Sequence, residues 1–359
     1  MYSDQDIESA VAAGVLPADA ARALRRHVEA ERQLPVADEE QFRLITGFND
    51  IFVSIAAVIL LVAVAWIGYV IPPHFEGNGP TPFMGLFAAA TAWGLAEFFT
   101  RQRRMALPSI LLLLAFVGGV FAAAVVAGFV AVGPTRSDNS ATPFAIAAAV
   151  AGAIAAGSAW LHWRRFRVPI TVAAGTAAGI VIVVASLAAA IGDAFAFDQV
   201  IIPVILLLGL GVFALAMWWD GSDRERRTRR SDVAFWLHLL AAPMIAHPVF
   251  HLLGVTRGED IGAGASVGVL AIYVLFGIVA LAIDRRALLV SALAYVLFAL
   301  TQLFRQFGAV ELNVALTALV IGSALLLLSA FWPAARRLVV GRLPAGLGHR
   351  LPPTHAVAL

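Results

Sequence analysis

The sequence contains no cysteine and no lysine, and only 13% of its 359 residues are charged. Without cysteine there is no disulfide framework, no thiolate metal ligand and no cysteine nucleophile. Without lysine there is no GxxxxGK[ST] phosphate-binding loop, and no HExxH zinc motif is present. These absences argue against ATP-driven and zinc-protease chemistry. We therefore expect no catalytic residues, no bound metal and no cofactor.

Hydrophobic residues make up 61% of the chain, which is more than one aqueous core can hide. A soluble protein of this length covers itself with polar groups, and about 25% of its residues are charged. The apolar residues instead fall into ten runs, most of them near the 20 residues that cross a bilayer as a helix. Because the runs do not alternate as barrel strands do, the predicted fold class is all-α, a polytopic membrane helical bundle. The runs are 51–71, 82–99, 105–132, 144–163, 168–191, 199–219, 233–254, 265–283, 287–304 and 312–332.

All 25 basic residues are arginine, and they gather between alternate runs. If the N-terminal segment is cytoplasmic, 22 arginines lie inside and only Arg136, Arg257 and Arg305 lie outside. The positive-inside rule then predicts a bacterial inner-membrane protein with both termini in the cytoplasm. One missed span would scramble this alternation, so the arginines also support the count of ten. Their position beside apolar runs indicates the lipid bilayer as partner and excludes nucleic acid.

The first 50 residues differ from the rest because they carry a net charge of −5. They lack the early apolar stretch of a signal peptide. Gly14 is placed to end one short helix and Pro17 to begin another. The predicted domains are a cytosolic helical hairpin over 1–35, an amphipathic juxtamembrane helix over 36–50, a ten-span membrane domain over 51–332 and a flexible basic tail over 333–359.

A hairpin of this size is too small to bury much of a core by itself. Its apolar seam is therefore expected to pack on a cytosolic protein partner or on the membrane. The partner-docking residues predicted for this seam are Ile7, Val11, Leu24 and Val28.

The segment that reads Ile7-Glu-Ser-Ala-Val-Ala-Ala-Gly14-Val-Leu, followed by Ala20, Ala21 and Leu24, resembles a short hairpin found in a family of uncharacterised bacterial inner-membrane proteins. In that family, known as a domain of unknown function, A-x-x-A-G-x-[LI]…A…L precedes a long series of spans. The resemblance covers about 30 N-terminal residues and the general topology, by motif matching alone. It implies a location and an architecture and carries no catalytic residues. The ten-span count also resembles the drug/metabolite transporter superfamily, without any of its specific motifs.

Ionisable groups inside a membrane are costly, so each is a functional candidate. Glu97 lies near the cytoplasmic end of the second run, where it is either a proton or cation site or a carboxylate that reaches the interface. The seventh run carries the largest polar set: His238, His247 and His251, with Pro243 and Pro248.

His247 and His251 are four residues apart and share a helix face. A metal site needs a third and a fourth ligand, and only His74 and Glu76 offer donors on that side. The pattern therefore favours a hydrogen-bonded histidine pair. Pro243 is expected, with Pro248, to free backbone carbonyls and kink the helix, as in transporters with broken helices, although a purely structural kink is the alternative.

Ten spans also divide into two sets of five, which predicts an inverted repeat in which the second run corresponds to the seventh. Glu97 and His238 then lie at similar depth and are predicted to pair.

In the fifth run, Gly175 and Gly179 form a GxxxG motif expected to pack within the protein.

Three functions remain open at this point. The first is a secondary transporter or permease-like protein for a small solute, with a path near Glu97, His238, His247, His251, Pro243 and Pro248. The second is a non-catalytic scaffold or sensor whose hairpin docks a partner. The third, an intramembrane enzyme, has the least support, so the chain is predicted not to be an enzyme. The topology and the prolines favour transport, partly by analogy of fold.

Overall fold

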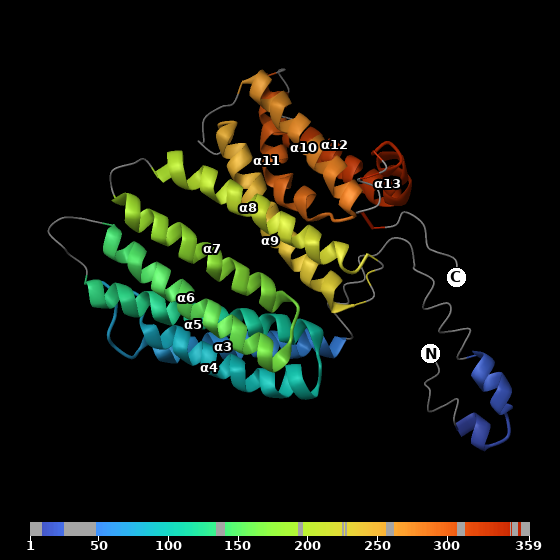
Figure 1. Cartoon of the computed structure of the whole chain (residues 1–359), viewed down its shortest axis with the longest axis horizontal. Coiled ribbons are helices and arrows are strands. Elements are labelled where there is room, and N and C mark those ends of the chain that lie inside the picture. The colour runs from blue at the N-terminus through green and yellow to red at the C-terminus, as the bar shows by residue number, and fades with distance from the viewer. Residues whose placement is uncertain are drawn as a thin grey trace.

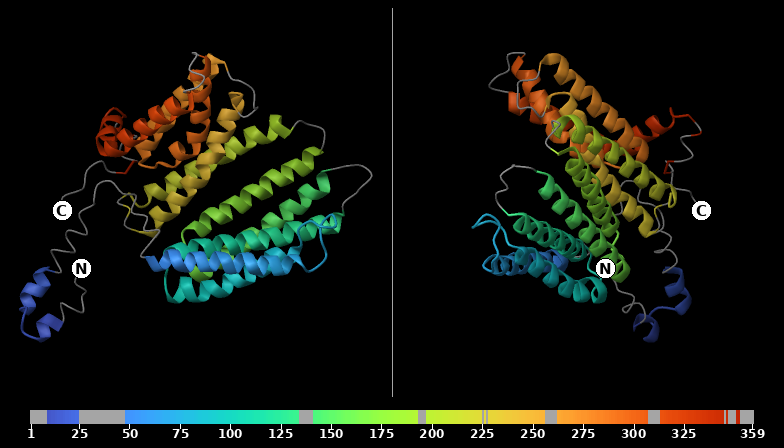
Figure 2. Two further views of the ribbon diagram at one scale, coloured as in Figure 1. Left: turned by 180° about the vertical axis from the view of Figure 1, so that it is seen from behind. Right: turned by 60° about the vertical axis from the view of Figure 1, so that its left-hand side comes forward.

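The computed structural model describes residues 9–24, 48–133, 141–192, 197–224, 226, 228–255, 262–306, 313–344, 346 and 351–352. Over these residues the chain is helical and contains no strand. The long helices form two groups that lie one above the other in Figure 1, blue to yellow-green below and yellow to red above. The reverse view in Figure 2 shows the same division. The all-α helical bundle predicted from the apolar runs is thus confirmed.

The first group packs helices that are neighbours in sequence, so that α4 lies against α3 and α5, and α6 lies against α5 and α7. Its core is made largely of alanine, with larger side chains such as Leu112, Leu113 and Phe116 on α5. Small residues let helix backbones approach closely, which is the main way in which helices gain contact in lipid. The helices are α3 (Phe48–Tyr69), α4 (Pro82–Ala96), the π-helix η1 (Glu97–Gln102), α5 (Ala106–Val132), α6 (Thr142–Phe166) and α7 (Ile170–Ile191).

The second group is centred on α9, which packs against α8, α11 and α7. Of the most apolar part of α9, 56% is buried, against 11% for α7. Leu237, Phe250 and several alanines of α9 therefore form the middle of the second core. The helices are α8 (Phe197–Gly221), α9 (Arg229–Leu252), α10 (Ala263–Ile283), α11 (Ala287–Gln306), α12 (Asn313–Ala330) and α13 (Trp332–Val340).

Nine helices within the described ranges are long and apolar enough to cross a membrane, and they correspond to the first nine predicted runs. The tenth run corresponds to α12, which bends by 77° into α13 and passes the same test only together with it. The chain is therefore a multi-pass membrane protein. Residues 333–340, which were assigned to the flexible tail, belong instead to helix α13. The content of proline, glycine and arginine predicted a flexible tail there, but Trp332 and Arg336 are buried against the second group.

The crossing of α4 and α5 shows why glycine is needed in the first group. A Cβ atom added to Gly85 would lie 2.3 Å from the Gly119 carbonyl oxygen, and one added to Gly119 would lie 2.7 Å from the Gly85 carbonyl oxygen. Both obstacles are backbone atoms that cannot rotate away. The neighbouring Gly118 faces open space. Two glycines thus set the distance between these helices.

The N-terminal segment is described only over residues 9–24. Two short helical stretches flank Gly14, which has a φ of +70°, and the second begins directly after Pro17. This agrees with the predicted ends of the hairpin helices. Most of the predicted juxtamembrane helix over 36–50 lies outside the described residues, and α3 itself starts at Phe48.

The arginine-bearing turns between helices gather at one end of the molecule, here called the arginine-rich end. Contacts join them: Arg165 at the end of α6 pairs with Glu97, and Trp236 near the start of α9 packs against both cores.

Candidate functional site

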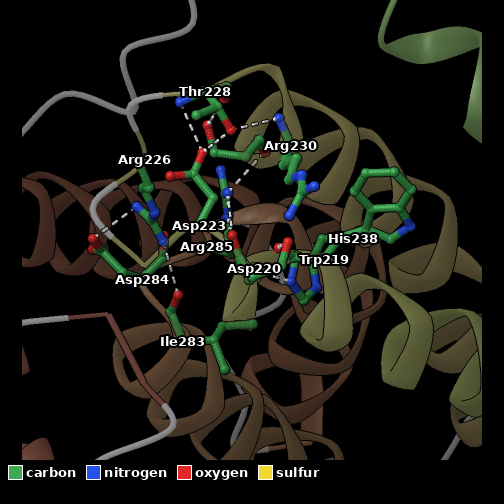
Figure 3. A network of polar contacts seen from close by, with 12 residues as sticks. Trp219, Asp220, Asp223, Arg226, Thr228, Arg230, His238, Ile283, Asp284 and Arg285 are labelled. Carbon is green, nitrogen blue, oxygen red and sulfur yellow. Dashed lines mark hydrogen bonds and ion pairs between the residues drawn. The ribbon is translucent and has the colours of Figure 1, made fainter.

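The most concentrated set of charges in the described structure surrounds the turn between α10 and α11. We call Asp220, Arg226, His238, Asp284 and Arg285 the charged cluster. Figure 3 shows these side chains converging from the end of α8, the connector that follows it, the first half of α9 and the α10–α11 turn. In the α10–α11 turn, the successive residues Asp284 and Arg285 contact different partners.

Asp284 ends α10 in the left-handed conformation, with a φ of +57°, and its carboxylate faces two other elements. Nη1 of Arg226 donates to Asp284 Oδ2 at 3.0 Å, and the Trp332 indole donates to Oδ1 at 2.8 Å. Arg336 of α13 lies 3.6 Å from the same carboxylate. Nη2 of Arg226 also donates to the carbonyl of Ile283. Asp284 therefore ties the α8–α9 connector and α13 to the end of α10.

Arg285 turns the other way, into the second core. Its Nη2 atom donates to Asp220 Oδ1 at 2.7 Å and to the carbonyl of Ser231 at 3.1 Å. His238 Nε2 lies 3.2 Å from the other carboxylate oxygen of Asp220. Asp220 and His238 are each 3% exposed and Arg285 is 4% exposed. Buried charges are tolerated only when paired in this way.

Aromatic faces complete the surroundings of the two arginines in the turn. The Arg285 guanidinium lies 5.8 Å from the centre of the Phe235 ring, and that of Arg286 lies 4.7 Å from Trp332. Such cation–π contacts strengthen when water is excluded. Burial lowers the pKa of the Arg226 guanidinium, because its charged form loses water.

The chain returns to this region near its C-terminus. Arg224 donates to the carbonyl of Leu351 at 3.0 Å, and Arg336 donates to that of Pro352 at 2.7 Å. Leu351 and Pro352 are buried. The charged cluster, together with Arg224 and Arg336, thus holds together α8, α9, the α10–α11 turn, α13 and a later part of the chain. Its chemistry is that of buried and half-buried ion pairs.

Glu97 does not pair with His238, so that prediction is wrong. Glu97 begins the π-helix η1 and accepts hydrogen bonds from Arg165 of α6 at 2.7 and 2.9 Å and from Arg101 at 3.3 Å. Each helix group satisfies its own charges, because the two residues belong to different cores. Side chains of this ion pair are 30–40% exposed, as expected for a carboxylate that reaches the interface. A π-helix often marks a functional position, and here it brings Glu97 to α6.

The prolines of α9 do not break the helix. The helix continues from Arg229 to Leu252 through Pro243 and Pro248, which does not support the broken helix of a transporter and leaves the purely structural kink as a prediction. Pro243 is exposed and Pro248 is buried. Each proline removes one backbone hydrogen bond from α9. The helix is packed against α7, α8 and α11.

His247 and His251 lie on neighbouring turns of α9, with ring centres 6.3 Å apart. His247 Nδ1 lies 2.7 Å from the Tyr295 hydroxyl of α11. His74 instead lies 2.8 Å from the Tyr69 carbonyl. Among the residues that the structure describes, no group of three histidine, aspartate, glutamate or cysteine side chains could hold a metal ion.

The docking seam predicted for the hairpin is only partly described. Val11 is half-buried, Leu24 is 43% exposed and Val15 is 79% exposed. Ile7 and Val28 lie outside the described residues. A partner for this seam stays a prediction.

An apolar groove of about 440 Å³ runs between α7 and α8, where the two helix groups meet. Leu207 and Leu215 of α8 and Val183 of α7 line it, with Thr176 at one end. Gly175 of the GxxxG motif packs on Ala159, whereas Gly179 faces the groove. The motif therefore packs within the protein at one of its two glycines.

Several polar residues of the site were not singled out from the sequence. Asp220 follows two tryptophans at the end of an apolar run, and Asp284 opens a three-residue charged turn. An acid at the end of an apolar run could have indicated a buried ion pair.

His162 of α6 was not singled out either. It is fully buried among Trp93, Phe116 and Phe166, where its Nδ1 lies 3.3 Å from Thr171.

A GxSxG pattern also occurs, over residues 264–268. In hydrolases this pattern places serine on a turn between a strand and a helix. Here Ser266 lies inside α10 and is fully buried. It therefore lacks the exposed position that a nucleophile needs.

No protein-family model, no curated protein and no solved structure matches the chain.

Proposed function

We propose that this membrane protein is a secondary transporter or permease-like protein for a small solute. The observation that carries the proposal is the division into two helix groups, each with its own core, that meet mainly where α7 contacts α8 and α9. Many transporters work by moving one bundle against another around a site at their interface. The orientation that goes with this function has both termini in the cytoplasm of a bacterial cell.

The proposed solute path is the groove between α7 and α8 rather than the region near Glu97 and His238. It lies on the boundary between the groups, whereas the charged cluster lies entirely within the second group. In this proposal the cluster keeps α8 to α13 rigid, and motion is confined to the boundary of α7 with α8 and α9. The apolar lining favours a solute with a large apolar part.

The test uses the absence of cysteine, which leaves every introduced thiol unique. One spin-labelled pair, Phe48→Cys with Leu338→Cys, spans the two groups at the arginine-rich end. A second pair, Val70→Cys with Leu252→Cys, spans them at the opposite end. All four positions are more than half exposed, so labelling leaves both cores intact.

Distances are measured by pulsed electron paramagnetic resonance in lipid nanodiscs. Transport by rocking predicts two populations, in which the distance at one end is short when that at the other is long. A single narrow distance at both ends, at pH 6 and pH 8 and with or without sodium, would contradict the proposal.

A second candidate is the scaffold or sensor, which is favoured by the exposure of Val15 and Leu24 in the N-terminal segment. Exposed apolar side chains in a short helical segment suit a docking surface. Deletion of residues 1–35 should then abolish capture of a cytosolic partner and leave the spin-label distances unchanged. Equal capture by the full-length and shortened chains would exclude this function.

A further inference from the structure

The α7–α8 groove is open because two of the residues that line it are glycines. A Cβ atom added to Gly179 or to Gly211 would meet no atom within 4 Å. Both glycines line the groove, together with leucine, valine and isoleucine side chains. The empty width comes from two missing side chains on facing helices, so a slender apolar group can lie there without displacing protein atoms.

The depth of the groove indicates hydrocarbon rather than water as its content. Thr176 is six residues and Val183 is thirteen residues from the start of α7 at Ile170. At a rise of about 1.5 Å per residue, the groove extends from about 9 to about 20 Å along the helix. This range lies within a hydrocarbon core about 30 Å thick. An apolar groove at that depth suits an acyl chain.

Charge at the end of the groove selects among lipids. Exposed Arg167 lies three residues before α7, at the arginine-rich end, and exposed Arg230 lies in the first turn of α9. Trp236 of α9 packs against both cores, which brings the start of α9 beside the start of α7. Guanidinium groups bind phosphate through paired hydrogen bonds. Arg167 lies nine residues before Thr176, the groove residue nearest the start of α7.

We propose that the groove binds an acyl chain of an anionic phospholipid, with the phosphate held by Arg167 and Arg230. The proposal deepens the transport function by naming its substrate class, and it rests on that function only for movement of the lipid. Lipid binding is measured separately from movement of the two helix groups, so a negative result in one experiment does not decide the other.

Binding is tested by electron spin resonance on the purified full-length protein in vesicles, with phosphatidylglycerol or phosphatidylcholine spin-labelled on one chain. Gly179→Leu and Gly211→Leu fill the groove from its two sides. Gly157→Leu on α6 is the matched control, because a Cβ atom added there also meets open space and because Gly157, like Gly211, is exposed. We expect the motionally restricted phosphatidylglycerol signal to fall in both groove variants and to persist in the control.

The headgroup contact is tested with Arg167→Gln and Arg230→Gln. Each should lower the preference for phosphatidylglycerol over phosphatidylcholine about fivefold, which corresponds to about 1 kcal/mol per arginine near a membrane surface. An equal restricted fraction for both lipids, or unchanged binding in the two glycine variants, overturns the proposal. Retained binding with a single spin-label distance at each end would overturn transport and leave the lipid site intact.

Discussion

Replacing Arg285 with methionine should destabilise the protein more than any other single charge removal in the described structure. Methionine keeps most of the volume of arginine but gives no hydrogen bond. Asp220 would lose its 2.7 Å contact and keep only His238, while it remains 3% exposed. The Ser231 carbonyl would also lose its donor. The variant therefore leaves a buried carboxylate without its main counter-charge.

The size of the effect follows from burial. Breaking a buried ion pair by removing one partner costs about 3–5 kcal/mol. The matched comparison is Arg101→Met, which removes a 3.3 Å contact to Glu97 from an arginine that is 54% exposed. Exposed pairs contribute less than about 1 kcal/mol. Asp220→Leu combined with Arg285→Met should cost less than Arg285→Met alone, since no charge is then stranded.

Unfolding of the purified protein in mixed micelles, followed by tryptophan fluorescence, gives these free energies. Of the eight tryptophans, Trp219, Trp236 and Trp332 lie near the charged cluster. Equal losses for Arg285→Met and Arg101→Met would refute the reasoning. So would a double variant less stable than Arg285→Met, because the stranded carboxylate would then not be the cause.

Other variants test separate parts of the structure. Gly119→Leu should cost at least about 1–3 kcal/mol through overpacking against the backbone of α4, while Gly118→Leu, which faces open space, should cost nearly nothing in the same unfolding assay. Trp332→Phe should cost about 1 kcal/mol by removing one hydrogen bond to Asp284, and a loss of cleavage protection over α13 in limited proteolysis checks it. Tyr295→Phe should cost about 0.5–1.5 kcal/mol in the same unfolding assay, because it removes the hydroxyl that lies 2.7 Å from His247 Nδ1, and an unchanged free energy of unfolding would show that this contact does not stabilise the protein.

The long helices were predictable because hydrophobic length and arginine position act locally along the chain. Each run from 51–71 to 287–304 contains enough information to indicate a long apolar helix. The bend after Ala330 was not predictable in this way. The composition of residues 333–340 is typical of a flexible segment. Trp332 and Arg336 nevertheless contact Asp284, which is far away in sequence.

The candidate site was harder to predict because it depends on which helices lie side by side. Hydropathy gives depth but not lateral position, so Glu97 and His238 were placed at one level without the knowledge that they belong to different cores. Asp220 was hidden for a related reason: its partner Arg285 lies 65 residues later. The order of helix contacts in the second group, where α9 packs on α11, also differs from the sequential order in the first.

The separation between Asp220 and Arg285 bears on how the chain is made. The carboxylate of Asp220 and its neighbour His238 are synthesised before Arg285, because the chain is made from its N-terminus. Until the α10–α11 turn is present, burying that carboxylate is costly, because a buried charge needs a partner. Final burial of Asp220 therefore depends on a residue that lies outside the α8–α9 hairpin.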